Sequence, residues 1–175
     1  MHEMTPALTP LLTANQIQMR ITELARAIEE NTQPEITIHL VGVLTGSFMF
    51  LADLARSFKR PVTIEFVRYS SYRNGTEPVE PPVCELKPRR ASGRHVLVVE
   101  DIVDTGETLH ALHTFLATLN PQTLRTVCLL DKPTRRRRHV PVEFIGFTIE
   151  DIFVVGYGLD YADQYRSLPH IVELR

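Results

Sequence analysis

Apolar residues recur along this chain with two different periods, which predict alternating helices and strands. Three segments carry apolar side chains at the three-to-four-residue spacing of a helix buried on one face, and four carry the continuous or alternating runs of a buried strand. The predicted helices are 14–31, about 48–58 and 106–119, and the predicted strands are 36–44, 61–69, 95–100 and 123–130. Thr13 and Gln16 have the spacing of a capping box, which marks the start of the first helix.

The order strand, helix, strand, repeated along the chain, predicts an α/β fold. Right-handed crossovers make such a sheet mostly parallel and place helices on both of its faces. We therefore expect a single domain spanning residues 1–175, with its core at about 14–141.

Two segments depart from this pattern. The polar stretch 70–82 contains three prolines and an Asn-Gly pair, and it predicts a long loop that is either a lid, a binding loop or a disordered segment. Residues 83–87 are expected to return as a short strand beside 64–69. After Pro141, the short apolar segments 142–147 and 152–157 predict a small antiparallel hood, formed by residues 142–175 with the N-terminal segment.

Composition narrows the class of protein without indicating its chemistry. The 175 residues include 19 basic and 21 acidic side chains, and the formal net charge of −2 argues against a protein that coats nucleic acid or an anionic membrane. Two cysteines, Cys84 and Cys128, are too few for a disulfide framework. The longest nearly apolar stretch, 40–52, is too short to span a bilayer, so we expect a cytoplasmic protein.

The segment with the clearest chemistry is 98–108, which reads Val-Val-Glu-Asp-Ile-Val-Asp-Thr-Gly-Glu-Thr. A buried strand delivers Glu100 and Asp101 to its carboxyl end, the edge at which open α/β sheets bind ligands. Asp104 follows, and residues 105–108 lead into a helix whose first N–H groups, with a glycine and two hydroxyls, suit a phosphate. Three carboxylates beside a phosphate cradle predict a phosphorylated sugar and a divalent metal. The alternative is a solvated turn whose acids complement the helix dipole.

This segment resembles the phosphoribosyl pyrophosphate motif of the type I phosphoribosyltransferases. Residues 43–47, 70–72, 130–133 and 153–161 extend the resemblance to the purine-salvage branch, the hypoxanthine(-guanine) phosphoribosyltransferases, over 36–174. The resemblance implies a central, mostly parallel sheet with helices on both faces, a small hood and a flexible active-site loop. It also implies transfer of the 5-phosphoribosyl group from phosphoribosyl pyrophosphate to N9 of hypoxanthine or guanine, giving IMP or GMP and pyrophosphate.

The same resemblance implies a role for each matching residue. Asp104 would be the catalytic base that accepts the proton of purine N7, a task that a carboxylate performs in a cleft where burial raises its pKa. The phosphoribosyl group would be bound by Glu100, Asp101, Asp104, Thr105, Gly106, Glu107 and Thr108. The other predicted groups are Thr45, Gly46 and Arg166 for pyrophosphate, Lys132, Phe153 and Val154 for the purine, Glu100, Asp101 and Asp160 for Mg²⁺, and Ser71 and Tyr72 for the lid.

At two of these positions, the residue type carries a specific expectation about how pyrophosphate or the purine is bound. Many relatives carry a lysine at position 45, so Thr45 leaves pyrophosphate contact there to backbone N–H groups, a hydroxyl and the metal. Lys132 would donate to the 6-oxo group of the purine. Adenine presents a donor at that position and would leave the lysine unsatisfied.

Two other functions remain open from the sequence. The first is an RNA-binding regulator on the same fold, which the run Arg135–Arg138 would suit. The net charge instead favours a solvated turn or an oligomer contact for this run. The second is a xanthine- or guanine-preferring relative. We expect small-molecule substrates, no nucleic acid, and a homodimer or homotetramer, the last from the resemblance alone.

Overall fold

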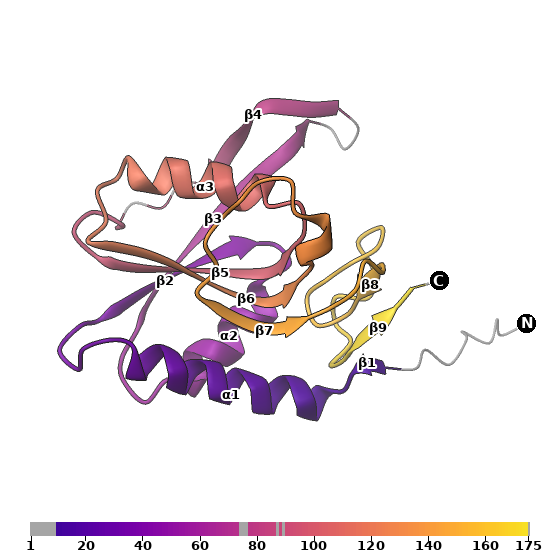
Figure 1. The fold of residues 1–175 in the computed structure, drawn as a ribbon, viewed down its shortest axis with the longest axis horizontal. Helices are drawn as coiled ribbons and strands as arrows, with labels where there is room; N and C mark the ends of the chain where they lie inside the picture. Colours follow the sequence, from indigo (N-terminus) through magenta and orange to yellow (C-terminus); the bar gives the residue numbers. More distant parts are fainter. Residues whose placement is uncertain (1–9, 74–76, 87, 89, 175) are drawn as a thin grey trace, which may run out of the picture.

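A six-stranded sheet with the strand order β4-β3-β2-β5-β6-β7 forms the centre of the molecule in this computed structural model (Figure 1). The structure describes residues 10–73, 77–86, 88 and 90–174, without the side chains of 69–86. The strands are β2 (Ile38–Leu44), β3 (Thr63–Arg73), β4 (Glu77–Leu86), β5 (His95–Val103), β6 (Thr123–Asp131) and β7 (Phe144–Thr148). All neighbours pair in parallel except β3 and β4, which are antiparallel. The predicted α/β class is therefore confirmed.

Helices cover both faces of this sheet, as the alternation of elements predicted. Helices α1 (Ala14–Glu30) and α2 (Phe48–Ser57) lie on one face, and α3 (Glu107–Ala117) lies on the other (Figure 1). Strand β5 shows how one strand serves two cores, because Leu97 and Val99 pack toward α1 and α2 while Val96 and Val98 pack toward α3. In the described part of the chain, no helix is both long and apolar enough to cross a bilayer.

The predicted capping box fixes the start of α1. The Thr13 hydroxyl accepts a hydrogen bond from the Gln16 backbone N–H at 3.3 Å, and the Thr13 N–H donates to the Gln16 side chain at 2.9 Å. The buried stripe of α1 is formed by Ile17, Ile21, Leu24, Ala25 and Ile28. This stripe holds the helix against the sheet and α2.

A separate three-stranded antiparallel sheet forms the hood, with the order β1-β9-β8. Its strands are β1 (Pro10–Leu12), β8 (Val154–Val155) and β9 (Ile171–Glu173). The prediction that 142–147 belongs to the hood is wrong. Strand β7 instead extends the central sheet parallel to β6, and the crossover between them contains only the short 3₁₀ helix η1 (Pro133–Arg135).

The predicted loop over 70–82 is also largely wrong, because most of it is strand. Strand β3 continues to Arg73 and β4 begins at Glu77, so the two form a long ribbon that extends beyond the sheet (Figure 1). β4 is an edge strand, and an edge tolerates prolines because one row of its N–H groups faces away from the sheet. The backbone of Ser71 and Tyr72 lies in β3, but their side chains lie outside the described part, so their lid role stays a prediction.

Candidate active site

A pocket of about 360 Å³ opens where the carboxyl ends of β2, β5 and β6 meet the hood, a volume typical of small-molecule sites. The structure brings together side chains from six separate stretches of the chain. The lining residues are Thr45, Gly46, Asp101, Ile102, Asp104, Lys132, Phe153, Val154, Leu159, Asp160 and Arg166. Every residue predicted to bind pyrophosphate or purine is among them.

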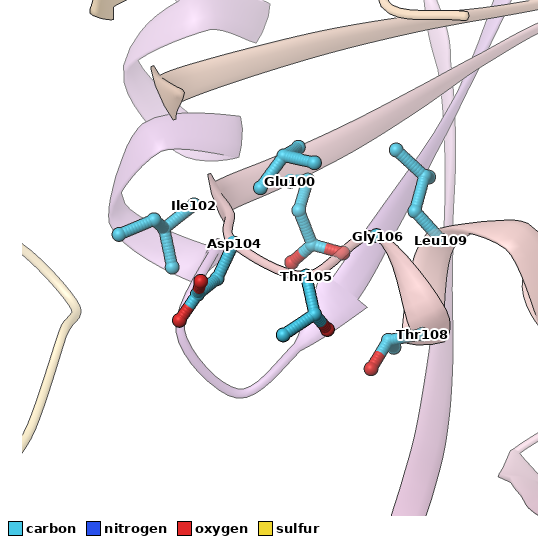
Figure 2. Close-up of a pocket in the computed structure, with 8 residues that line it drawn as sticks. Glu100, Ile102, Asp104, Thr105, Gly106, Thr108 and Leu109 are labelled. Carbon is cyan, nitrogen blue, oxygen red and sulfur yellow. The ribbon is translucent and has the colours of Figure 1, made fainter. Parts of the chain in front are cut away.

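A second pocket lies at the end of β5, beside the start of α3 (Figure 2). It is lined by Glu100, Ile102, Val103, Asp104, Thr105, Gly106, Thr108 and Leu109. Gly106 precedes the first residue of α3 with a φ of +83°, a left-handed conformation that glycine adopts without strain. Asp104 lines both pockets and so stands between them.

Glu107 is the predicted phosphoribosyl-binding residue that does not line either pocket. It is the first residue of α3, where the helix dipole stabilises its negative charge. Its carboxylate accepts from Arg138 Nε at 3.2 Å, so Glu107 points toward the arginine-rich turn. A negative side chain in this loop therefore does not face the space that would hold a phosphate.

Glu100 and Asp101 form a pair of adjacent carboxylates whose ionisation the fold opposes. Burial raises the pKa of Glu100 well above its usual range, and the neighbouring charge of Asp101 adds to the increase. Burial also raises the pKa of Asp101, while hydrogen bonds including one from the Ile102 N–H at 2.9 Å oppose that increase. A nearby cation would relieve this unfavourable negative charge.

The raised pKa of Glu100 predicts a pH-dependent effect of Glu100→Gln on stability. The folded protein retains the Glu100 proton over a pH range in which the unfolded chain has lost it. Stability therefore falls as pH rises from about 4, the unfolded value, through the folded pKa. Glutamine removes this cost, so in metal-free buffer we expect the variant to melt about 2–4 °C higher than wild type at pH 8 and equally at pH 4.

Thermal unfolding in the presence of a chelator measures this difference. Glu150→Gln is the matched control, since it makes the same chemical change at an exposed position and should show no pH-dependent difference. A melting temperature of Glu100→Gln below that of wild type at pH 8 would contradict the expected sign.

The carboxylates of this site suit a magnesium ion that is bound mainly by the substrate. In the described residues, no group of three His, Cys, Asp or Glu side chains is placed to hold a metal alone. Mg²⁺ keeps several waters and commonly uses one or two carboxylates plus substrate phosphates, which fits the oxygen donors of Glu100 and Asp101. Asp160 pairs with Arg166 at 2.8 Å, so its predicted part in the metal site stays a prediction.

The turn after β2 contacts β5 and the hood at the same point. A Cβ on Gly46 would overlap the Asp101 carboxylate, and a Cβ on Gly158 would overlap the Gly46 carbonyl oxygen. The Leu44–Thr45 peptide bond is cis. Arg68 of β3 donates to the Thr45 hydroxyl at 3.5 Å, so a cation from the neighbouring strand lies beside this uncharged residue.

Lys132, Phe153 and Val154 are the lining residues of the larger pocket that were predicted to bind the purine. The Lys132 side chain is 6% exposed, and its ammonium donates to the Ile152 carbonyl at 2.6 Å. Phe153 is 52% exposed and packs edge-on against Tyr161, with 5.8 Å between ring centroids. A buried cation beside an exposed aromatic face is suited to a flat ligand with a polar edge.

Arg166 completes the pocket from the hood. Besides its ion pair with Asp160, it donates to the Gly158 carbonyl at 2.8 Å. These contacts hold its guanidinium near the turn of Gly46, which the Gly158 backbone touches. The two charges that the sequence alone would place in solvent therefore pair with each other at the pocket.

Like Arg68, Arg135 is a charged neighbour of this site that the sequence interpretation missed. Its Nε lies 2.9 Å from Asp104 Oδ1, whereas the sequence favoured a solvated turn. A signal was available, because Arg135 follows the carboxyl end of β6 by four residues and β6 is the parallel neighbour of β5. Carboxyl ends of adjacent parallel strands converge on the same site.

Comparisons with known proteins agree with this geometry. The family model described as "Phosphoribosyl transferase domain" matches residues 8–162. The hypoxanthine phosphoribosyltransferase of Haemophilus influenzae is 44% identical over 164 residues, which is 92% of each chain. The hypoxanthine-guanine phosphoribosyltransferase of Aquifex aeolicus is 40% identical over 162 residues, 92% of this chain and 91% of its own.

Solved structures give the same result. A hypoxanthine-guanine phosphoribosyltransferase from Bacillus anthracis, with a HEPES molecule in its active site, superposes with a TM-score of 0.89 at 42% identity, covering 95% of this chain and 98% of that one. The Trypanosoma cruzi hypoxanthine phosphoribosyltransferase in a ternary substrates complex gives 0.86 at 41% identity, covering 95% and 94%. This chain belongs to the phosphoribosyltransferase family, and its relatives are enzymes of purine salvage.

Proposed function

We propose that this protein is a purine-salvage enzyme that transfers the 5-phosphoribosyl group of phosphoribosyl pyrophosphate to N9 of hypoxanthine and guanine. The observation that carries the proposal is the placement of Asp104 between two pockets, one suited to a phosphate and one to a flat base. The sequence relatives named for this reaction support it at 40–45% identity.

The residues of the smaller pocket suit the phosphoribosyl group. The backbone at Thr105 and Gly106, the start of α3 and the hydroxyls of Thr105 and Thr108 offer donors to a 5′-phosphate. Glu100 of this pocket and Asp101 of the larger one offer acceptors to the ribose hydroxyls. When Mg²⁺ is bound with the substrate, it supplies charge neutralisation for the pyrophosphate leaving group.

The larger pocket suits the purine and the departing pyrophosphate. Phe153 offers a ring face to the base, and the Lys132 ammonium keeps donors for the 6-oxo oxygen beyond the one it gives to Ile152. Thr45, Gly46 and Arg166 line the same pocket and suit the pyrophosphate. Asp104 then receives the N7 proton as N9 attacks C1 of the ribose and the bond from C1 to the pyrophosphate oxygen breaks, while the predicted lid with Ser71 and Tyr72 would keep water from C1.

The RNA-binding alternative is not favoured by this structure. Within the run Arg135–Arg138, Arg135, Arg136 and Arg138 each pair with a carboxylate of the same molecule. Guanidinium groups neutralised in this way offer little charge to a phosphate backbone, which dominates RNA affinity.

A steady-state assay tests the proposal directly. Hypoxanthine, guanine, xanthine and adenine are each supplied with phosphoribosyl pyrophosphate and Mg²⁺, and nucleotide formation is measured. We expect turnover of hypoxanthine and guanine and at least about 10²-fold lower kcat/KM for adenine, because adenine leaves Lys132 without an acceptor. Absence of turnover with both 6-oxopurines would refute the proposal, and preferred use of xanthine would assign the protein to the xanthine-preferring class.

A further inference from the structure

The four arginines of residues 135–138 form a turn that packs against the loop between β5 and α3. We call this segment the arginine turn. The backbone N–H groups of Arg137 and Arg138 both donate to the Thr105 carbonyl, at 2.9 and 3.0 Å. A Cβ on Gly106 would lie 2.6 Å from the Arg138 carbonyl oxygen. The arginine turn therefore packs against the loop that lines the smaller pocket and stabilises it through these two hydrogen bonds.

Arg135 is the member of the arginine turn that contacts Asp104, the carboxylate that lines both pockets. Its Nε lies 2.9 Å from Asp104 Oδ1, and one of its terminal nitrogens lies 3.4 Å from Asp151 Oδ2. Asp104 belongs to the loop after β5, and Asp151 lies two residues before Phe153. One guanidinium thus joins the loop of the smaller pocket to the segment that carries the aromatic wall of the larger one.

We propose that Arg135 is a positioning residue for Asp104, an inference that rests on the proposed function. The guanidinium is a planar, rigid fork, and contacts on two of its nitrogens fix its orientation. A carboxylate held by such a fork loses rotational freedom before the substrate arrives, which favours proton transfer from a correctly placed N7. Arg135 stays charged at any working pH and cannot itself take that proton.

The other arginines of the turn act elsewhere. Arg136 pairs with Asp131 at the end of β6, and Arg138 pairs with Glu107, which lines neither pocket. The exposed Arg137 side chain makes no ion pair with any residue that the structure describes. Arg137 therefore offers a matched control, because its replacement removes the same charge from the same turn without touching Asp104.

The test compares Arg135→Gln, Arg135→Lys and Arg137→Gln in steady-state kinetics with hypoxanthine, phosphoribosyl pyrophosphate and Mg²⁺. We expect Arg135→Gln to lower kcat about tenfold, with the KM for phosphoribosyl pyrophosphate and the melting temperature nearly unchanged, because an exposed ion pair adds little stability. Arg135→Lys should recover part of the loss, since one ammonium can hold Asp104 without bridging to Asp151. Arg137→Gln should match wild type.

Three results would overturn the inference: an unchanged or higher kcat in Arg135→Gln, an equal loss in Arg137→Gln, or no recovery in Arg135→Lys. Higher turnover would show that the ion pair restrains Asp104 instead of positioning it. The wild-type assay separates this inference from the proposed function. A wild-type protein without turnover removes the proposed function, whereas an active wild type with an unaffected Arg135→Gln variant removes only the role of Arg135.

Discussion

Replacing Asp104 with asparagine is expected to lower turnover about 10²-fold or more while substrate binding is nearly unchanged. Asparagine has the same shape as aspartate and can still accept a hydrogen bond from Arg135. It cannot take up the N7 proton at neutral pH, so the loss falls on the chemical step. General-base catalysis commonly contributes about 10²–10⁴-fold, which sets the expected size.

Two measurements separate chemistry from binding in this variant. Steady-state IMP formation gives kcat, and titration calorimetry with phosphoribosyl pyrophosphate and Mg²⁺ gives the dissociation constant, expected within about threefold of wild type. Glu150→Gln removes an exposed acid that lines neither pocket and should keep full turnover. A kcat of Asp104→Asn within tenfold of wild type would mean that another group accepts the proton.

Gly46→Ala is expected to reduce kcat/KM for phosphoribosyl pyrophosphate about 10²-fold or more. The added Cβ would occupy the position of the Asp101 carboxylate, so either that carboxylate or the turn after β2 must move. Both lie in the pocket, and Asp101 is the proposed partner of the ribose hydroxyls and the metal. A displacement of about 1 Å at such a site is enough for a 10²-fold loss.

Gly93→Ala provides the control for this substitution. Gly93 has a φ of +66°, and a Cβ there would meet no atom within 4 Å. We expect Gly93→Ala to cost about 1 kcal/mol of stability through backbone strain and to leave kinetics unchanged. If Gly46→Ala kept the wild-type KM for phosphoribosyl pyrophosphate, the close packing of Asp101 on this turn would have no part in substrate binding.

The elements with strong periodicity were predictable from the sequence. The apolar stripe of α1 predicts a helix, and the continuous apolar runs of β2, β5 and β6 predict buried strands. The structure agrees with these predictions to within a few residues. Thr13 and Gln16 located the start of α1 because the capping box depends on local spacing alone. Local patterns of this kind need no knowledge of the rest of the chain.

The segments that were mispredicted depend on distant partners. Residues 142–147 were assigned to the hood because the pattern after Pro141 changes to short apolar segments. Strand β7 instead joins the central sheet through a connection that contains only η1, whereas parallel crossovers usually contain a helix. The polar, proline-containing segment 70–82 carried loop signals that an edge strand tolerates. The N-terminal segment was predicted to join the hood, but its strand β1 was not predicted, because its partner, β9, is about 160 residues away along the chain.

The residues of the candidate site also fall into those that a local motif predicts and those that depend on distant partners. The 98–108 motif placed Glu100, Asp101 and Asp104 at one sheet edge because a strand end determines where adjacent residues emerge. The contacts of Arg135 with Asp104 and of Arg68 with Thr45 join residues more than 20 positions apart. Such pairings follow from strand order and register, which a single sequence does not reveal.

The pairing of β1 with β9 has a consequence for how the protein forms on the ribosome. All strands of the central sheet and the loop between β5 and α3 lie before residue 149, whereas the hood needs residues 171–173 to pair with residues 10–12. A nascent chain that stops before residue 171 therefore contains every strand of the central sheet and all residues that line the smaller pocket, but it lacks the strand that the hood requires. The hood side of the larger pocket is therefore completed only after β9 has left the exit tunnel and can pair with β1.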